Sequence, residues 1–297
     1  MDTPQLVSEG LSNLLGATLV NKLEIENPIG SFKGRGIDWF MQNWDWGDRV
    51  VTASAGNFGQ AVAYCAAKIG LIVDVFSSIN AEKTKIEAME SFGANVHLVG
   101  DDFDAAKIEA IEFANKNGFR FIEDGREPEI SEGAGTIGLE LGQYPEDLHI
   151  IYIPVGNGAL ISGIGAWCKK TMPETKIVGV CADAAPSMYL SWQQGRSIET
   201  ESAHTIADGI ACRVPVSESL TPVAAVVDEF VLVTEEQIVT AMRAYSQYEN
   251  LIVEPAGAVS LAASMASPSL NSDWVVATIV TGKNIDVSRF RTLVDGA

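Results

Sequence analysis

Short apolar runs alternate along the chain with longer segments whose apolar residues recur at helical spacing. The first half predicts strands and helices in alternation, at 50–53, 57–69, 71–77, 82–92, 95–99, 103–117 and 119–122. The second half repeats this order less strictly, at 150–155, 160–170, 177–181, 235–249, 256–266 and 274–280. Uninterrupted apolar strands joined by helices are typical of parallel sheets buried on both faces. The pattern therefore predicts an α/β protein.

No repeat, low-complexity segment or linker marks a domain boundary in the 297 residues. This length suits one large domain or two modest ones. We expect two parallel-sheet α/β domains, a large one formed by residues 1–48 and 126–297 and a small one formed by residues 49–125. Binding sites form preferentially where domains meet, so we expect the functional site there.

The charge balance narrows the range of partners. The chain has 20 Lys and Arg against 39 Asp and Glu, a net charge of −19, which opposes binding to nucleic acids. No signal peptide and no apolar run of about 20 residues is visible, so we expect a cytoplasmic protein that does not enter a membrane. The scattered cysteines are interpreted as buried thiols of a reducing compartment: Cys65, Cys168, Cys181 and Cys212.

Histidine is scarce, which limits the catalytic chemistry. His97 and His149 lie in predicted strands, where histidine is usually structural, and His204 is interpreted as an exposed loop residue. A Ser-His-Asp triad or a histidine-rich zinc site would need better-placed histidines. An enzyme of this composition more naturally uses a lysine that carries a cofactor.

The first candidate loop is the segment 27–36, in which Lys33 lies beside Gly30, Gly34 and Gly36. Glycines let a backbone approach a ligand closely, and a partly desolvated lysine can form a Schiff base. An ordinary surface turn would have the same composition. The Gly-Lys-Ser/Thr sequence of an ATP-binding P-loop is absent.

Two further loops each lie between a predicted strand and a predicted helix. In 52–59, Ser54 and the amides beside it would lie at a helix N-terminus, which attracts carboxylates and phosphates, although a plain N-cap has the same pattern. In 154–163, two glycines open a helix whose N–H groups could hold a phosphate. Gly163 comes two positions too late for the G-x-G-x-x-G pattern of dinucleotide-binding proteins.

Taken in order, these loops resemble those of fold-type II pyridoxal-phosphate enzymes, whose fold is like that of the tryptophan synthase β subunit, and most of all threonine and serine dehydratases. The segment 31–36, Ser-Phe-Lys-Gly-Arg-Gly, is similar to the family's cofactor-lysine motif. The segments 54–57 and 156–160 resemble its substrate-carboxylate loop and its phosphate-binding loop. Further matching segments lie at 133–140, 207–210, 254–258 and 281–286.

The resemblance implies a role for each motif. Lys33 would bind pyridoxal 5'-phosphate and later remove the Cα proton of the substrate. The backbone that would hold the phosphate is that of Gly156, Asn157, Gly158, Ala159 and Leu160. The residues that would hold the substrate carboxylate are Ser54, Ala55, Gly56 and Asn57. Asn57 would also hydrogen-bond the ring oxygen of the cofactor, and Thr281 would meet its ring nitrogen.

The implied activity is β-elimination from a small hydroxy-amino acid such as L-threonine or L-serine, which yields a 2-oxo acid and ammonia, in a homodimer. A neutral hydroxyl at Thr281 leaves the ring nitrogen largely unprotonated, so the ring is a weak electron sink. A β-hydroxyl that departs promptly suits such a site better than transamination does.

Several residues depart from the family pattern. Phe58 stands where histidine is usual, and Ala55 stands where serine racemases carry a hydroxyl, so we expect little racemase activity. Arg126 lies in a segment that borders the family's substrate pocket and could pair with a second anionic group; an exposed arginine among acidic neighbours is the alternative interpretation. Lys283 replaces a usual glycine. His204 replaces a glutamate that binds a cation in some relatives, so we expect no metal.

Two other functions remain open from the sequence. A β-replacement synthase, cysteine synthase-like or diamino-acid-forming, would share most motifs; Asn27-Pro28 favours it, and the lack of threonine in 156–160 opposes it. A non-catalytic protein that binds amino acids or the cofactor would not need Lys33. Because the chain ends soon after its last motif, we expect no C-terminal regulatory domain.

Overall fold

The computed structural model describes residues 2–268 and 270–296, and the chain divides into two compact units. Unit 1 contains Met1–Ser31 and Ala134–Ala297, and unit 2 contains Phe32–Gly133. The sequence suggested boundaries at 48/49 and 125/126. Unit 2 thus takes in a helix that follows Phe32 and the beginning of a second helix that ends at Leu141, both of which the sequence assigned to the large domain.

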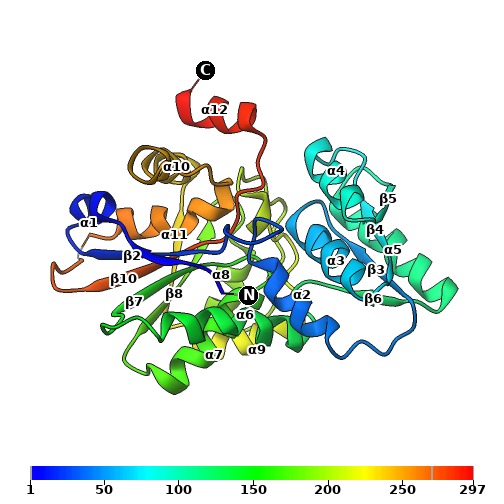
Figure 1. Ribbon diagram of the computed structural model, residues 1–297, viewed down its shortest axis with the longest axis horizontal. Helices are drawn as coiled ribbons and strands as arrows, with labels where there is room; N and C mark the ends of the chain where they lie inside the picture. Colours follow the sequence, from blue (N-terminus) through cyan, green and yellow to red (C-terminus); the bar gives the residue numbers. More distant parts are fainter. Residues whose placement is uncertain (1, 269, 297) are drawn as a thin grey trace. The chain divides into compact units, whose positions relative to one another are not determined.

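Unit 1 is built on a six-stranded sheet with the strand order β1-β2-β10-β7-β8-β9 (Figure 1). The strands are β1 (Gln5–Val7), β2 (Thr18–Leu23), β7 (Ile150–Pro154), β8 (Lys176–Ala182), β9 (Glu229–Val233) and β10 (Val275–Val280). Only β1 and β2 are antiparallel; the other neighbours are parallel. Every residue of β7 and β10 is buried, which accounts for their uninterrupted apolar sequences.

Helices cover both faces of the unit 1 sheet. They are α1 (Glu9–Leu15), α7 (Ala159–Thr171), α8 (Ser187–Gln194), η1 (Asp208–Ile210), α9 (Ser217–Val226), α10 (Glu235–Glu249), α11 (Pro255–Ala266) and α12 (Val287–Asp295). In Figure 1, α10 and α11 lie on one face, and α7 and α9 lie on the other. The core under α10 and α11 joins apolar side chains of these helices to those of the central strands, such as Met242, Leu261 and Val276.

Unit 2 has a smaller, fully parallel sheet with the order β5-β4-β3-β6. Its elements are α2 (Lys33–Met41), β3 (Arg49–Ala53), α3 (Asn57–Lys68), β4 (Ile72–Ser77), α4 (Lys83–Ser91), β5 (Asn95–Leu98), α5 (Phe103–Asn117) and β6 (Arg120–Ile122). The alanines Ala106, Ala110 and Ala114 form a stripe along α5 and pack in one core with Val51 and Phe76. The alternation predicted for both units is therefore confirmed.

Helix α6 (Pro128–Leu141) begins in unit 2 and ends in unit 1, and glycines let it pack closely at both ends. Within unit 2, a Cβ on Gly133 would lie 2.5 Å from the carbonyl oxygen of Arg35. Within unit 1, a Cβ on Gly135 would lie 3.0 Å from the carbonyl oxygen of Gly163 in α7. The glycines of the segment 133–140 thus permit close contact between backbones.

The two strand histidines have structural contacts. The ring nitrogen Nδ1 of His149 accepts a hydrogen bond from the backbone N–H of Val275, at 3.1 Å. Nε2 of His97 lies 2.8 Å from a carboxylate oxygen of Asp74, and its ring stacks on Phe76. These contacts are consistent with the structural role predicted for both histidines.

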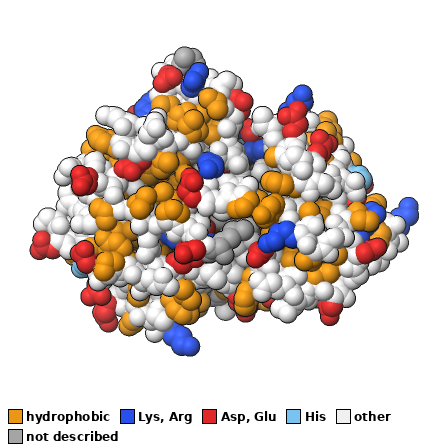
Figure 2. Space-filling view, in the orientation of Figure 1, with side chains coloured by type: hydrophobic (Ala, Val, Ile, Leu, Met, Phe, Trp, Pro, Cys, Tyr) orange, Lys and Arg blue, Asp and Glu red, His pale blue; other side chains and the backbone are white. Residues whose placement is uncertain are grey.

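The surface is mixed in charge. On the face shown in Figure 2, acidic and basic side chains are interspersed with apolar ones, and no basic band crosses it. Within 2–268 and 270–296, no helix combines the length and the apolar character needed to cross a membrane. In the same residues, no three His, Cys, Asp or Glu side chains are grouped so that they could hold a metal ion.

The cysteines provide a test of the fold. Cys65, Cys168, Cys181 and Cys212 are buried, and no disulfide bond joins them in the described residues. Burial raises the pKa of the Cys65 and Cys168 thiols to about 12, so little reactive thiolate forms near neutral pH. We expect the thiols of the native protein to react with Ellman's reagent far more slowly than those of the denatured protein. Rapid labelling of these cysteines in protein with an unchanged circular dichroism spectrum would contradict the described packing.

Candidate functional site

The candidate residues lie on loops that follow parallel strands. In unit 2, β3 and β6 are neighbours, so the loops that begin at Ser54 and Glu123 leave the same edge of the sheet. In unit 1, β7 and β10 are neighbours, and the residues that follow them include Gly156 and Thr281. Ligands of open α/β sheets bind outside the carboxyl ends of the strands. The structure therefore gathers the predicted residues into two groups, one in each unit.

Lys33 is enclosed within unit 2. It is the first residue of α2, its side chain is 12% exposed, and its Nζ lies 2.6 Å from Oδ2 of Asp124. The ring centroids of Phe32 and Phe58 lie 4.7 and 6.0 Å from the same nitrogen. The ammonium group is thus held by one carboxylate and flanked by aromatic rings.

Asp124 directly follows the first residue of the loop after β6. One of its carboxylate oxygens, Oδ2, accepts the bond from Lys33. The other oxygen, Oδ1, is buried and has no hydrogen-bond partner in the part of the chain that the structure describes. A buried acceptor without a donor is unusual in folded proteins and often indicates a missing ligand or water.

The loop after β3 is held by its own serine. The hydroxyl oxygen of Ser54 is buried and accepts hydrogen bonds from the backbone N–H groups of Gly56, at 3.1 Å, and Gly59, at 2.9 Å. Ala55, Gly56 and Asn57 remain half-buried between fully buried neighbours. The serine hydroxyl therefore shapes the turn, and the half-buried residues at the start of α3 form its accessible part.

A lysine from α4 lies against this turn. The side chain of Lys85 is 6% exposed, and a Cβ on Gly56 would lie 3.4 Å from its Cδ and 3.7 Å from its Nζ. The ammonium group forms an ion pair with Glu82 at 3.5 Å. Lys85 thus brings a positive charge close to the loop predicted to hold a carboxylate.

The glycine-rich turn after β7 opens helix α7. Gly158 is the N-cap residue, with a φ of +91°, and a Cβ there would lie 2.5 Å from Cγ2 of Val223. The first N–H groups of a helix have no partner within the helix, and no side chain caps this one at its N-cap residue. The turn is formed by the predicted phosphate-binding residues Gly156, Asn157, Gly158, Ala159 and Leu160. Its backbone has the features of an anion-binding site.

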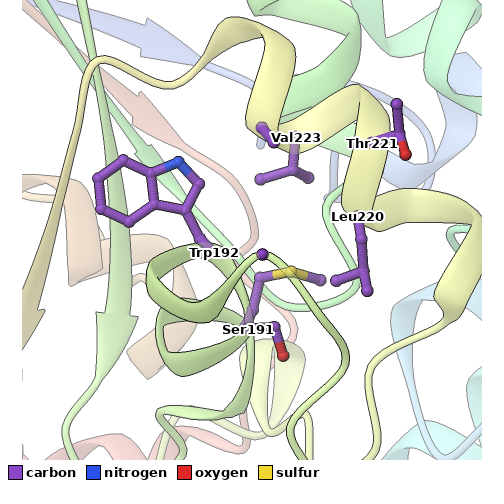
Figure 3. A pocket seen from close by; sticks show the side chains of 8 residues that line it. Ser191, Trp192, Leu220, Thr221 and Val223 are labelled. Atoms are coloured by element: carbon purple, nitrogen blue, oxygen red, sulfur yellow. The ribbon is translucent and has the colours of Figure 1, made fainter.

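A small pocket lies behind this turn. It has a volume of about 160 Å³ and is lined by residues of α8 and α9, among them Trp192, Leu220 and Val223 (Figure 3). None of its lining residues is charged. Because Val223 also packs behind Gly158, the pocket borders the turn from inside unit 1.

Thr281 follows β10 and is buried. Its hydroxyl donates a hydrogen bond to the carbonyl oxygen of Ala256, at 3.2 Å. A hydroxyl has one proton, so Thr281 can donate to a ligand only if it gives up this bond. Lys283 is 42% exposed and lies 3.5 Å from a carboxylate oxygen of Glu26, an arrangement that turns its charge toward solvent.

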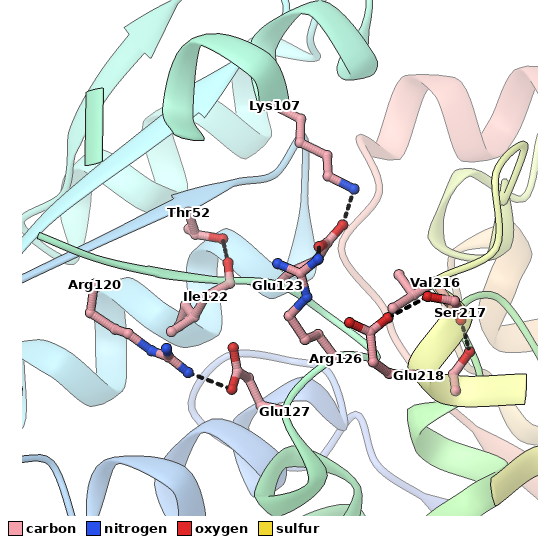
Figure 4. Close-up of polar contacts among 11 residues, drawn as sticks. Thr52, Lys107, Arg120, Ile122, Glu123, Arg126, Glu127, Val216, Ser217 and Glu218 are labelled. Carbon is pink, nitrogen blue, oxygen red and sulfur yellow. Dashed lines mark hydrogen bonds and ion pairs between the residues drawn. The ribbon is translucent and has the colours of Figure 1, made fainter. Parts of the chain in front are cut away.

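Ion pairs anchor the chain on either side of Asp124 (Figure 4). Glu123 is buried and bonds to Lys107, and Arg126, whose side chain is 45% exposed, lies 3.5 Å from the other Glu123 oxygen. Arg120 donates to Glu127 at 2.7 Å. Burial raises the pKa of the Glu127 carboxyl above its ordinary value, and the nearby guanidinium of Arg120 opposes that rise. Arg126 thus lies in the segment that follows β6 and has an acidic partner.

Three residues of these groups were not predicted from the sequence. Asp124 meets Lys33 across 91 positions, and no local pattern announces such a pair. Lys85 lies on an amphipathic helix whose lysines look like surface residues. Ser162 lies one turn into α7, and its hydroxyl is buried without a hydrogen-bond partner in the described chain. In the sequence, only its position within the segment 154–163 indicated that Ser162 could belong to the site.

Comparison with known proteins gives a consistent picture. A family model described as pyridoxal-phosphate dependent enzyme matches residues 1–282. An L-threonine ammonia-lyase of Geobacter sulfurreducens is 36% identical over 296 residues, which cover 99% of this chain and 74% of that protein. An L-threonine ammonia-lyase of Thermotoga maritima is 35% identical, and the match covers 97% of this chain and 72% of that protein. The chain spans 50% of a chloroplastic threonine dehydratase of Solanum lycopersicum that is 32% identical over 99% of this chain.

Solved structures agree with these relatives. The processed form of threonine deaminase isoform 2 from Solanum lycopersicum superposes with a TM-score of 0.94 at 32% identity, and the match covers 100% of this chain and 83% of that one. Maize serine racemase superposes with a TM-score of 0.92 at 26% identity, over 99% and 92% of the two chains. The predicted fold class is therefore confirmed.

The close packing of Val223 against the turn before α7 can be tested by adding one methyl group at Gly158. We expect Gly158→Ala to lower the free energy of unfolding by about 2–4 kcal/mol, because it combines a positive φ with a steric clash. Gly195→Ala is the matched control, since Gly195 also has a positive φ, +63°, but a Cβ there would meet nothing within 4 Å. Chemical denaturation measures both variants. Equal losses of stability would show that Val223 does not close the turn.

Proposed function

Because the chain belongs to the family of pyridoxal-phosphate-dependent enzymes, we propose that it is an ammonia-lyase that removes water from a small hydroxy-amino acid such as L-threonine or L-serine. The products are a 2-oxo acid and ammonia. The observation that carries the proposal is the enclosed Lys33, which lies in unit 2 at the same sheet edge as the loop of Ser54. The relatives named threonine ammonia-lyase support it.

The residues present fit pyridoxal phosphate. The turn at Gly156 and Gly158 has no room for further side-chain atoms, and its helix lacks a side-chain cap at the N-cap residue, which suits a phosphate group. Lys33 offers a partly desolvated amine for the aldehyde. Thr281 offers a hydroxyl for the ring nitrogen once its hydrogen bond to the carbonyl oxygen of Ala256 is broken. We assign the phosphate to the backbone of Gly156, Asn157, Gly158, Ala159 and Leu160.

The substrate is assigned to unit 2. The backbone of the turn formed by Ser54, Ala55, Gly56 and Asn57 would hold the carboxylate, with the charge of Lys85 close by. Asn57 would also hydrogen-bond the ring oxygen of the cofactor. Ser54 contributes mainly by holding the turn, since its oxygen already accepts two N–H groups. Arg126 is assigned to a second anionic group of the substrate.

The bound cofactor supplies an electron sink that makes the Cα proton of the substrate acidic. Lys33 takes that proton on Nζ, and Asp124 holds the resulting ammonium group. The Cα–H and Cβ–O bonds break, a Cα=Cβ bond forms, and the proton and the hydroxide leave as water. Hydrolysis of the product enamine then gives the 2-oxo acid and ammonia.

We also propose that the enzyme works as a homodimer in the cytoplasm. The four buried cysteines, which form no disulfide bond in the described residues, suit a reducing compartment. Light scattering would show twice the chain mass of 31.7 kDa if the dimer forms.

The function is tested by 2-oxo acid release from purified, cofactor-loaded protein given L-threonine, L-serine, threo-3-hydroxyaspartate or phenylserine. We expect release from at least one of them, and its complete loss in Lys33→Ala, because Lys33 is the amine assigned both to the cofactor aldehyde and to the Cα proton. Lys83→Ala, which changes an exposed lysine of the same unit, is the control. Substituted amino acid formed on addition of a nucleophile, with no oxo acid, would instead identify a β-replacement synthase.

The assignment of Arg126 is tested by selectivity. We expect Arg126→Ala to lower kcat/KM for threo-3-hydroxyaspartate about tenfold more than kcat/KM for L-threonine, since it removes a charge-assisted hydrogen bond to the β-carboxylate only. Arg196→Ala, at an exposed position in unit 1, controls for the change in net charge. An unchanged ratio would leave Arg126 as a surface residue paired with Glu123.

A further inference from the structure

We propose that Asp124 determines the specificity of this site: its oxygen Oδ1 accepts a hydrogen bond from the β-substituent of the substrate and selects amino acids whose β-group is a hydrogen-bond donor. This inference rests on the proposed function, because it uses the position of the substrate relative to Lys33. It goes beyond that function by naming the group that recognises the hydroxyl.

The first argument is the state of the Asp124 carboxylate. Oδ2 accepts a hydrogen bond from Lys33 at 2.6 Å, whereas Oδ1 is buried and has no hydrogen-bond partner in the described residues. Burying an ionised acceptor without a donor is costly, so such an oxygen needs an explanation. A donor that arrives with the substrate provides one.

The second argument is distance. If Lys33 removes the Cα proton, the substrate Cα must come within about 3–3.5 Å of Nζ. Oδ2 of Asp124 lies 2.6 Å from the same nitrogen. Oδ2 therefore lies within about 6 Å of the reacting carbon, and Cβ with its hydroxyl is one bond further. A β-hydroxyl directed toward unit 2 can reach Oδ1.

The third argument is that neighbouring charges are already paired. Glu123 forms ion pairs with Lys107 and Arg126, and Glu127 accepts a hydrogen bond from Arg120 (Figure 4). One buried oxygen of each of these two carboxylates has no hydrogen-bond partner in the described residues. These pairs anchor the backbone on both sides of Asp124 and leave Lys33 as its ion-pair partner. A fixed carboxylate with one occupied oxygen is a directional acceptor, which favours a hydroxyl or an ammonium group over a substituent that cannot donate.

The experiment compares two substrates that differ in this donor. L-Serine carries a β-hydroxyl, and β-chloro-L-alanine carries a leaving group of similar size that cannot donate a hydrogen bond. Oxo acid release is measured for the wild type, Asp124→Ala, Asp124→Asn and the control Asp45→Asn, which lies at an exposed position of unit 2. All variants are tested as the full-length, cofactor-loaded protein.

We expect Asp124→Ala to lower kcat/KM for both substrates, because Asp124 also holds Lys33, and to lower it about tenfold or more further for L-serine than for β-chloro-L-alanine. Asp124→Asn keeps the shape of the side chain and loses its charge. The ratio of kcat/KM for L-serine to kcat/KM for β-chloro-L-alanine should therefore fall by about threefold or more. If Asp124→Ala does not fold, the kcat/KM ratio of Asp124→Asn tests the inference in its place. Asp45→Asn should leave the ratio unchanged.

Binding provides a readout that does not depend on turnover. The dissociation constant of L-alanine, which has no β-substituent that can donate, is measured from the change in the visible spectrum of the bound cofactor. It should stay within about twofold in both Asp124 variants, because no bond to Oδ1 is lost. The dissociation constant of pyridoxal phosphate itself is measured alongside.

Each outcome has a distinct meaning. An equal fall of kcat/KM for both amino acids would overturn the inference, since Asp124 would then act only by positioning Lys33. No change for either would overturn it as well. If the wild type releases no oxo acid from either compound, the proposed function fails, and this inference fails with it.

Discussion

Parallel pairing of β3 with β6 in unit 2, and of β7 with β10 in unit 1, fixes where the functional loops emerge. Strands that run in one direction must end at one edge, and the helices that follow them begin there with unpaired N–H groups. The turns before α3 and α7, to which we assign the substrate carboxylate and the phosphate, both follow from this arrangement. The chemistry is then decided by a few side chains that such backbones bring together.

The acidic residues around Asp124 in unit 2 have partners that differ in their exposure to solvent. Glu123 and Glu127, which flank the key aspartate, are buried and neutralised by basic side chains that reach partly into solvent. Asp124 alone in this segment turns to the enclosed Lys33. Buried ion pairs add little to stability, because desolvation offsets their attraction. Their value here is geometric, since they hold one carboxylate in a fixed direction beside one amine.

The sequence predicted the apolar strands and the helices between them, because burial on both faces leaves a local pattern. It did not predict β2, since Asn21 and Lys22 interrupt its apolar run. The structure buries both: Lys22 pairs with Glu140, and Asn21 accepts bonds from Tyr245 and Thr278. Likewise, the motif around Lys33 indicated the cofactor lysine, but its pairing with Asp124 could not be derived, since such pairs leave no periodicity. The roles assigned to individual site residues remain predictions.

The topology also sets an order of assembly during synthesis. Unit 2 is a continuous stretch of chain, so its sheet can form as soon as Gly133 has left the ribosome. The sheet of unit 1 cannot close so early, because β2 pairs with β10, whose residues lie 257 positions later. Until then the edge of β2 that β10 will cover is unpaired, and such edges invite association between chains. The enzyme can thus complete its lysine-bearing unit first, and it depends on its last strand, β10, to cover its second, β2.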